Sequence, residues 1–105
     1  MRKNKNDSLT VIARALCADY ERRKECINDE SVSRRVRMEY VYLNKKLIEA
    51  AGEVCGARFA EAFIKEIGEG VGYAYSGIDC MSEVTYKNYK KSICDSIIRK
   101  LHLSD

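Results

Sequence analysis

The 105-residue chain predicts an all-α fold, a compact bundle of about four helices that forms a single domain over residues 1–105. Three observations support this prediction. Apolar residues recur every three or four positions along most of the chain. No segment shows the alternation of apolar and polar residues that a half-buried strand would have. Proline, which breaks helices by removing a backbone hydrogen bond, is absent.

The first helix is expected to begin at Asp7 or Ser8, because either side chain can accept a hydrogen bond from a free N–H group of the first turn. Residues 1–6 before it are expected to be a flexible, basic N-terminus. The basic triplet 22–24 is interpreted as a solvated helix end, where cations interact favourably with the helix dipole. The apolar face of this helix is predicted to hold Leu9, Ile12, Leu16 and Tyr20.

The longest helix is predicted over residues 31–55, capped by Asp29 or Ser31 and ended by Gly56 in a left-handed conformation. A third helix is expected from Ala57 to Ile67. The glycine-rich stretch 68–77 should then bend the chain through several positive φ values. The apolar row of the longest helix consists of Val32, Val36, Tyr40, Leu43, Leu47, Ala51 and Val54.

Nothing in the sequence points to catalysis or to a cofactor. The stretch 68–72 lacks the G-x-x-x-x-G-K-[ST] pattern and a preceding strand, so a nucleotide-binding loop is not expected. The single histidine, His102, lies near the C-terminus, and the carboxylates are scattered singly. We therefore predict no catalytic residue and no enzyme activity.

The cysteine pattern argues against a metal site. There are five cysteines, an odd number, and no pair has the C-x-x-C spacing typical of zinc ligands. We expect reduced thiols packed on helices: Cys17, Cys26, Cys55, Cys80 and Cys94. Because no apolar run approaches the roughly 18–20 residues of a membrane span, and no signal peptide is recognisable, a cytoplasmic protein without membrane contact is predicted.

The net charge of +3 is distributed unevenly. Residues 1–37 carry ten Lys and Arg against six Asp and Glu, residues 38–79 carry four against seven, and residues 80–103 carry five against two. Both ends are therefore basic and the middle is acidic. This pattern fits a basic face for a polyanion, and it also fits simple attraction between the ends and the middle of the fold.

The fourth helix is predicted to start after Ser82, its cap, and to reach about Leu101, with Tyr86, Tyr89, Ile93 and Ile97 on its inner face. Its first turns carry residue types with which a helix reads the DNA major groove. Lysines would contact phosphates, and short polar side chains would lie nearest the bases; a merely solvated face is the competing interpretation. The predicted DNA-binding residues are Ser82, Thr85, Lys87, Asn88, Lys90 and Lys91, with Tyr73 and Tyr75 as accessory contacts.

The segment from Met81 to Lys91, followed by Ile97-Ile98 and by Leu101-His102-Leu103, resembles the C-terminal helix-turn-helix of ArpU-like late-transcription regulators of Gram-positive phages. The shared pattern is a serine cap, a Thr-Tyr pair, several basic residues and an apolar helix. The resemblance is best over residues 43–103, and it implies a DNA-binding fold related to the DNA-reading domain of sigma factors.

The chain departs from that pattern in one respect. Roughly thirteen residues separate the third and fourth predicted helices, whereas a standard helix-turn-helix has about three or four. Either a short helix lies within 73–79, or the helix-turn-helix in this C-terminal half is degenerate.

The predicted function is that of a DNA-binding transcriptional regulator of a phage or mobile element, with duplex DNA as its partner. Two alternatives stay open. Size, charge pattern and phage-like character also fit an inhibitor of a bacterial defence nuclease, of the anti-CRISPR type, that binds the nuclease or its nucleic acid. The other alternative is a partner-binding or homodimer module with the helix at 31–55 as its interface.

Overall fold

The computed structural model describes residues 5–102, and within them every regular element is helical. The predicted all-α fold is thus confirmed, although there are five α-helices and not four. A short 3₁₀ turn, η1, lies between the last two of them. The elements are α1 (Lys5–Ala18), α2 (Tyr20–Ile27), α3 (Arg34–Cys55), α4 (Ala57–Glu69), η1 (Tyr73–Tyr75) and α5 (Glu83–Lys100).

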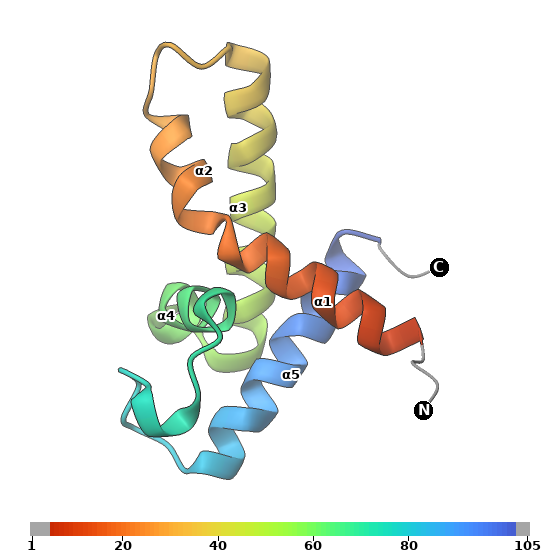
Figure 1. Ribbon diagram of the computed structural model, residues 1–105, viewed down its shortest axis with the longest axis vertical. Coiled ribbons are helices and arrows are strands. Elements are labelled where there is room, and N and C mark those ends of the chain that lie inside the picture. Colours follow the sequence, from red (N-terminus) through yellow and green to blue (C-terminus); the bar gives the residue numbers. More distant parts are fainter. Residues whose placement is uncertain (1–4, 103–105) are drawn as a thin grey trace.

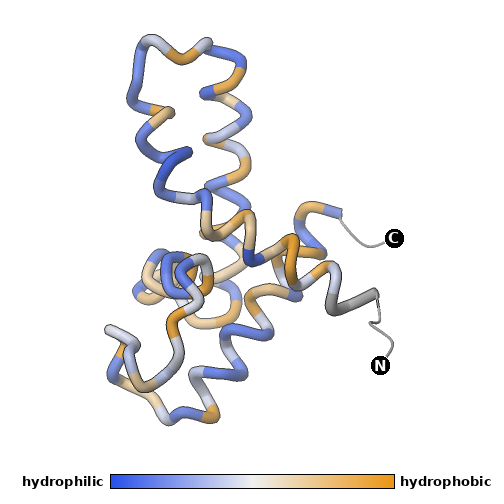
Figure 2. Tube along the Cα trace, viewed as in Figure 1, coloured by the Kyte–Doolittle hydropathy of each residue, from blue (hydrophilic) through white to orange (hydrophobic). Residues whose placement is uncertain are grey.

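The molecule has a body and a projecting arm (Figure 1). The body is formed where α1, α4, α5 and the C-terminal half of α3 cross, and the apolar segments of these helices meet there (Figure 2). The arm consists of α2 and the N-terminal half of α3. The radius of gyration is 14.2 Å, above the value of about 13 Å for a compact chain of this length, as expected for a fold with an extended arm. The most deeply buried large side chains of the body are Tyr86, Phe63, Leu47, Ile64, Ile93 and Ile97.

The first predicted helix is in fact two helices, because the chain turns at Asp19 between α1 and α2. α1 already begins at Lys5, so the flexible N-terminus expected over residues 1–6 is too long, and residues 1–4 lie outside the described part of the chain. The buried face of α1 also differs from the predicted apolar face. Ala13 and Cys17 are buried on it, whereas Ile12 is 43% exposed, since close packing favours the smaller residues.

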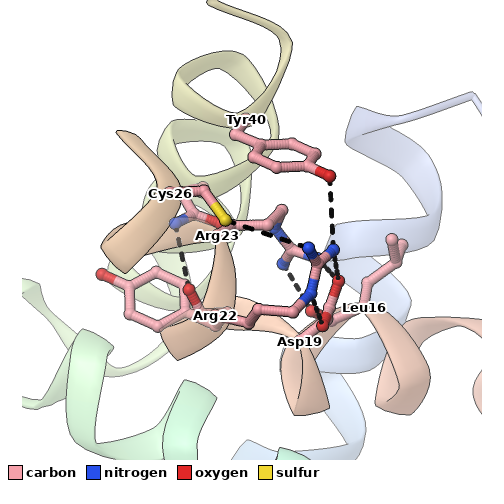
Figure 3. A network of polar contacts seen from close by, with 8 residues as sticks. Leu16, Asp19, Arg22, Arg23, Cys26 and Tyr40 are labelled. Atoms are coloured by element: carbon pink, nitrogen blue, oxygen red, sulfur yellow. Dashed lines mark hydrogen bonds and ion pairs between the residues drawn. The ribbon is translucent and has the colours of Figure 1, made fainter. Parts of the chain in front are cut away.

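The turn between α1 and α2 is held by Arg23, which is only 2% exposed (Figure 3). Its guanidinium donates hydrogen bonds to Asn44 Oδ1, at 2.7 Å, and to the Leu16 carbonyl at the end of α1. It also lies 3.5 Å from the carboxylate of Asp19. The interpretation of the triplet 22–24 as a solvated helix end is therefore wrong for its central residue, while Arg22 and Lys24 are exposed as expected.

α3 begins and ends close to the predicted positions. Ser33, and not Asp29 or Ser31, caps its N-terminus by accepting from the Val36 N–H at 3.3 Å. Asp29 instead accepts hydrogen bonds from the backbone and side chain of Ser31 in the preceding turn. Gly56 ends the helix with a φ of +86°, but its ψ of 156° is not left-handed helical.

α4 continues to Glu69, two residues beyond the predicted end, so Gly68 lies inside the helix. A Cβ atom on Gly68 would lie 2.6 Å from backbone atoms of Cys17 and Ala18. Gly68 therefore permits a backbone-to-backbone crossing of α1 and α4. Within the stretch 68–77, only Gly70 has a positive φ, of 71°, where it ends the helix.

The five thiols differ in their surroundings, although all are free. Cys17 and Cys94 are buried, Cys26 and Cys55 are half-buried, and Cys80 is exposed, so the expectation of packed thiols is wrong for Cys80. Burial raises the pKa of Cys17 to about 12. Cys17 is therefore an unreactive core residue at neutral pH.

Candidate nucleic-acid interface

The N-terminus of α5 is fixed by Ser82 and Thr85, two of the three short polar residues, with Asn88, that were expected to lie nearest DNA bases. Ser82 Oγ accepts a hydrogen bond from the Thr85 N–H at 3.2 Å, which confirms Ser82 as the cap. The same hydroxyl donates to Thr85 Oγ1 at 3.0 Å. Ser82 is exposed and Thr85 is half-buried. Their hydroxyl groups are thus already engaged with each other and with the helix end.

The carboxylate of Glu66 connects the segment between α4 and α5, residues 70–82, to the body of the fold. Glu66 Oε1 accepts hydrogen bonds from the hydroxyls of Tyr86 and Ser76, both at 2.6 Å. Its Oε2 accepts from the Gly77 N–H at 2.8 Å. Glu66 therefore joins α4, the connecting segment and the first turns of α5, and it sets how α5 is presented.

The hydrogen bonds around Glu66 favour its ionised carboxylate. Its burial alone would raise the carboxyl pKa, but the hydrogen bonds from Ser76, Tyr86 and Gly77 outweigh this effect, so the pKa lies below its ordinary value of 4.5. A group whose pKa is lowered on folding stabilises the fold above its unfolded pKa, and this contribution disappears as the pH falls through the folded pKa.

Replacing Glu66 with glutamine is expected to cost about 1–2 kcal/mol of unfolding free energy at pH 7, because three donors lose a charged acceptor. The difference between wild type and variant should shrink as the pH falls through the lowered pKa of Glu66, because the wild-type carboxylate becomes protonated there. Urea titrations at each pH measure this. A difference that is independent of pH would show that the charge of Glu66 is unimportant.

A basic groove lies beside the first turns of α5, between this helix and α1. Its volume is about 340 Å³. Four cationic side chains line it, one from α1 and three from α5, and none of its described lining residues is acidic. The complete lining is Thr10 and Arg14 of α1, Ile67 of α4, and Lys87, Lys90, Lys91 and Cys94 of α5.

The three lysines of the groove are not equivalent. Lys90 is half-buried: its ammonium donates to the Val71 carbonyl at 2.6 Å and lies 5.3 Å from the centre of the Tyr86 ring. Burial, reinforced by the positive charge of Arg14, lowers the pKa of Lys90. Lys91 is exposed, and so is Lys87, whose ammonium lies 3.6 Å from the carboxylate of Glu83.

The structure brings together some of the predicted site residues and separates others. Lys87, Asn88 and Lys91 are exposed on successive turns of α5. Tyr73 is half-buried, donates its hydroxyl hydrogen to the Met81 carbonyl and packs against the ring of Tyr86, so it is a packing residue. Tyr75, by contrast, is 88% exposed.

Arg14 is the groove residue that the sequence did not reveal. In the sequence it is a single charge that interrupts the apolar stretch of the first helix. It lies one turn after Thr10, next to the buried face of α1. The periodicity of α1 identifies that edge of the helix, but not α5 as the neighbour across it.

Comparison with protein-family models, curated proteins and solved structures gives no match for this chain. No helix within residues 5–102 is both long and apolar enough to cross a membrane. In the same part of the chain, no three or more His, Cys, Asp or Glu side chains are grouped so that they could hold a metal ion. Function therefore has to be inferred from the groove and its charges.

Proposed function

We propose that this protein binds duplex DNA through the basic groove and the first turns of α5, as a transcriptional regulator of the phage type. The observation that carries the proposal is the convergence of four cationic side chains, from two helices far apart in sequence, on one groove whose described lining residues include no acidic one. Ordinary surface lysines are interspersed with carboxylates, as on the outer faces of α2 and α4. A groove of one sign attracts a polyanion.

The geometry assigns different tasks to the site residues. Arg14, Lys87 and Lys91 are exposed and would supply charges for phosphate oxygens. Lys90, already bonded to Val71, adds charge from the floor of the groove. Asn88, exposed on α5 next to the groove, would contact a base edge.

The type of regulator is supported by the resemblance of residues 43–103 to ArpU-like proteins. The helix pair α4 and α5, joined through residues 70–82, stands where a helix-turn-helix would be, with η1 as the only regular element within the connection. Under this proposal, the long connection between α4 and α5 would make the pair a degenerate helix-turn-helix. A phosphate contact from Arg14 of α1 would add to those from the lysines of α5.

Replacing Arg14, Lys87 and Lys91 together with alanine is expected to weaken binding to random duplex DNA roughly 100-fold at about 50 mM salt. Four phosphate contacts predict a log–log salt slope near −3.6 for the wild type, and removing three of them should bring it to about −1. Fluorescence anisotropy with a labelled duplex over a salt series measures both quantities.

The control is a variant that loses three cations elsewhere: Lys24, Arg58 and Lys65, which lie on α2 and α4 and do not line the groove. Its net charge equals that of the groove variant, so a general charge effect would weaken both equally. Equal weakening would reject the groove as the binding site. Absence of wild-type binding at low salt would reject DNA binding itself and favour the nuclease-inhibitor alternative.

A further inference from the structure

The outer face of α3 carries a row of exposed apolar side chains. Met38 is 59% exposed, Tyr42 53% and Val41 41%. They lie on the arm, which projects from the body, and apolar segments recur along this half of α3 (Figure 2). Single exposed apolar residues are common on protein surfaces, but a continuous row on one helix face indicates a contact surface.

Helix geometry places this row within a longer stripe. At 100° per residue, Arg34, Met38, Val41, Lys45 and Glu49 share one side of α3. The buried residues Asn44, Leu47 and Ala51 lie on the other side, against the rest of the fold. Members of the stripe are three or four residues apart, which is the spacing with which one helix packs along another.

Hollows on both sides of the row offer room for the side chains of a facing helix, as knobs-into-holes packing requires. Their volumes are about 400 Å³ and about 470 Å³. The larger is lined by Met38, Glu39, Tyr42 and Leu43. The smaller includes Val41, Lys45, Ile48 and Glu49 among its lining residues.

We propose that this face binds a second copy of the same chain, with the two α3 helices antiparallel and a two-fold axis between Val41 and Tyr42. The charges along α3 are complementary to those of a second, antiparallel α3, which favours a second copy of the chain as the partner. In that register Arg34 faces Glu49 of the partner subunit, and the symmetry repeats the pair. Met38 then meets the aliphatic stem of Lys45 of the partner subunit, while the apolar row is covered at the centre.

Two further features favour this arrangement. Antiparallel helices place opposite ends of their dipoles side by side. In the proposed dimer, the N-terminal part of α3, with Arg34, Arg35 and Arg37, would also lie beside the C-terminal part of the partner's helix, which holds the partner's Glu49. Because one helix pair buries little area, the dimer should be concentration-dependent, with a dissociation constant in the micromolar range. The proposal does not depend on DNA binding.

Sedimentation equilibrium of the full chain over a wide concentration range tests the proposal. The wild type should show a monomer–dimer equilibrium. Met38→Glu, which places a charge at the centre of the interface, should weaken association at least tenfold while leaving helicity unchanged, because Met38 is exposed in the monomer. Val84→Glu changes an equally exposed residue on α5, far from the arm, and should leave association unaffected.

Charge reversal tests the register. Arg34→Glu and Glu49→Arg should each weaken association about five- to tenfold, since each creates two repulsive pairs in the dimer. Combining the two substitutions restores opposite charges and should return the dissociation constant to within about twofold of the wild type. A wild type that stays monomeric at high concentration, or a double variant that is no better than the single ones, would overturn the proposal.

Discussion

Replacing Gly68 with alanine is expected to lower the free energy of unfolding by about 3 kcal/mol or more. The added Cβ would lie 2.6 Å from the carbonyl carbon and oxygen of Cys17 and from the nitrogen of Ala18. These are backbone atoms, so no side chain can rotate away to make room. α1 and α4 would have to separate, which would loosen the contacts of both helices with the core. The urea midpoint, followed by circular dichroism, measures the loss.

The matched control is Gly52→Ala in α3, where no atom lies within 4 Å of the added Cβ. Alanine is the better helix former by about 1 kcal/mol, so this substitution should stabilise the protein slightly. The higher helix propensity of alanine also applies at Gly68. Only the close crossing with α1 turns the expected stabilisation into a loss of stability. Equal stabilisation by both substitutions would show that α1 and α4 do not approach so closely.

Replacing Arg23 with alanine should lower the free energy of unfolding by about 3–4 kcal/mol, the second of the two largest effects. Two buried acceptors, Asn44 Oδ1 and the Leu16 carbonyl, would lose their donors, and the long side chain would leave a cavity (Figure 3). Burial lowers the pKa of Arg23, but the side chain stays charged at neutral pH because an arginine titrates far above it.

Arg22 provides the comparison for Arg23. It is adjacent in sequence and hydrogen-bonded to Asp19 and Tyr40, but it is exposed. Arg22→Ala should therefore leave the urea midpoint nearly unchanged. Asn44→Ala should destabilise the protein too, and the double variant with Arg23→Ala should lose less than the sum of the two single losses, since both remove the same hydrogen bond. Similar losses for Arg22→Ala and Arg23→Ala would contradict the buried network.

Features that depend on a few neighbouring residues were predictable. The apolar periodicity correctly indicated an all-α fold, and Ser82 caps the last helix as its position before a helical segment implied. The positive φ at Gly56 was also predicted from the sequence, because glycine adopts a positive φ without steric cost. The lysines of the first turns of α5 were identified as candidate site residues, and three of them line one groove.

The sequence did not predict the features that depend on which helices pack against each other. Periodicity cannot tell that Gly68 lies against the backbone of α1, because the reason for the glycine is on another helix. It places Arg23 on a charged surface, because the acceptors that permit its burial come from Leu16 and Asn44. It separates Arg14 from the lysines by more than seventy positions, although the fold brings them to one groove. The sequence by itself thus determined the helical character of the chain and the start of α5, through apolar spacing and local hydrogen bonding. Only the tertiary structure decided which charges are buried and which converge, since burial and convergence are set by contacts between distant segments.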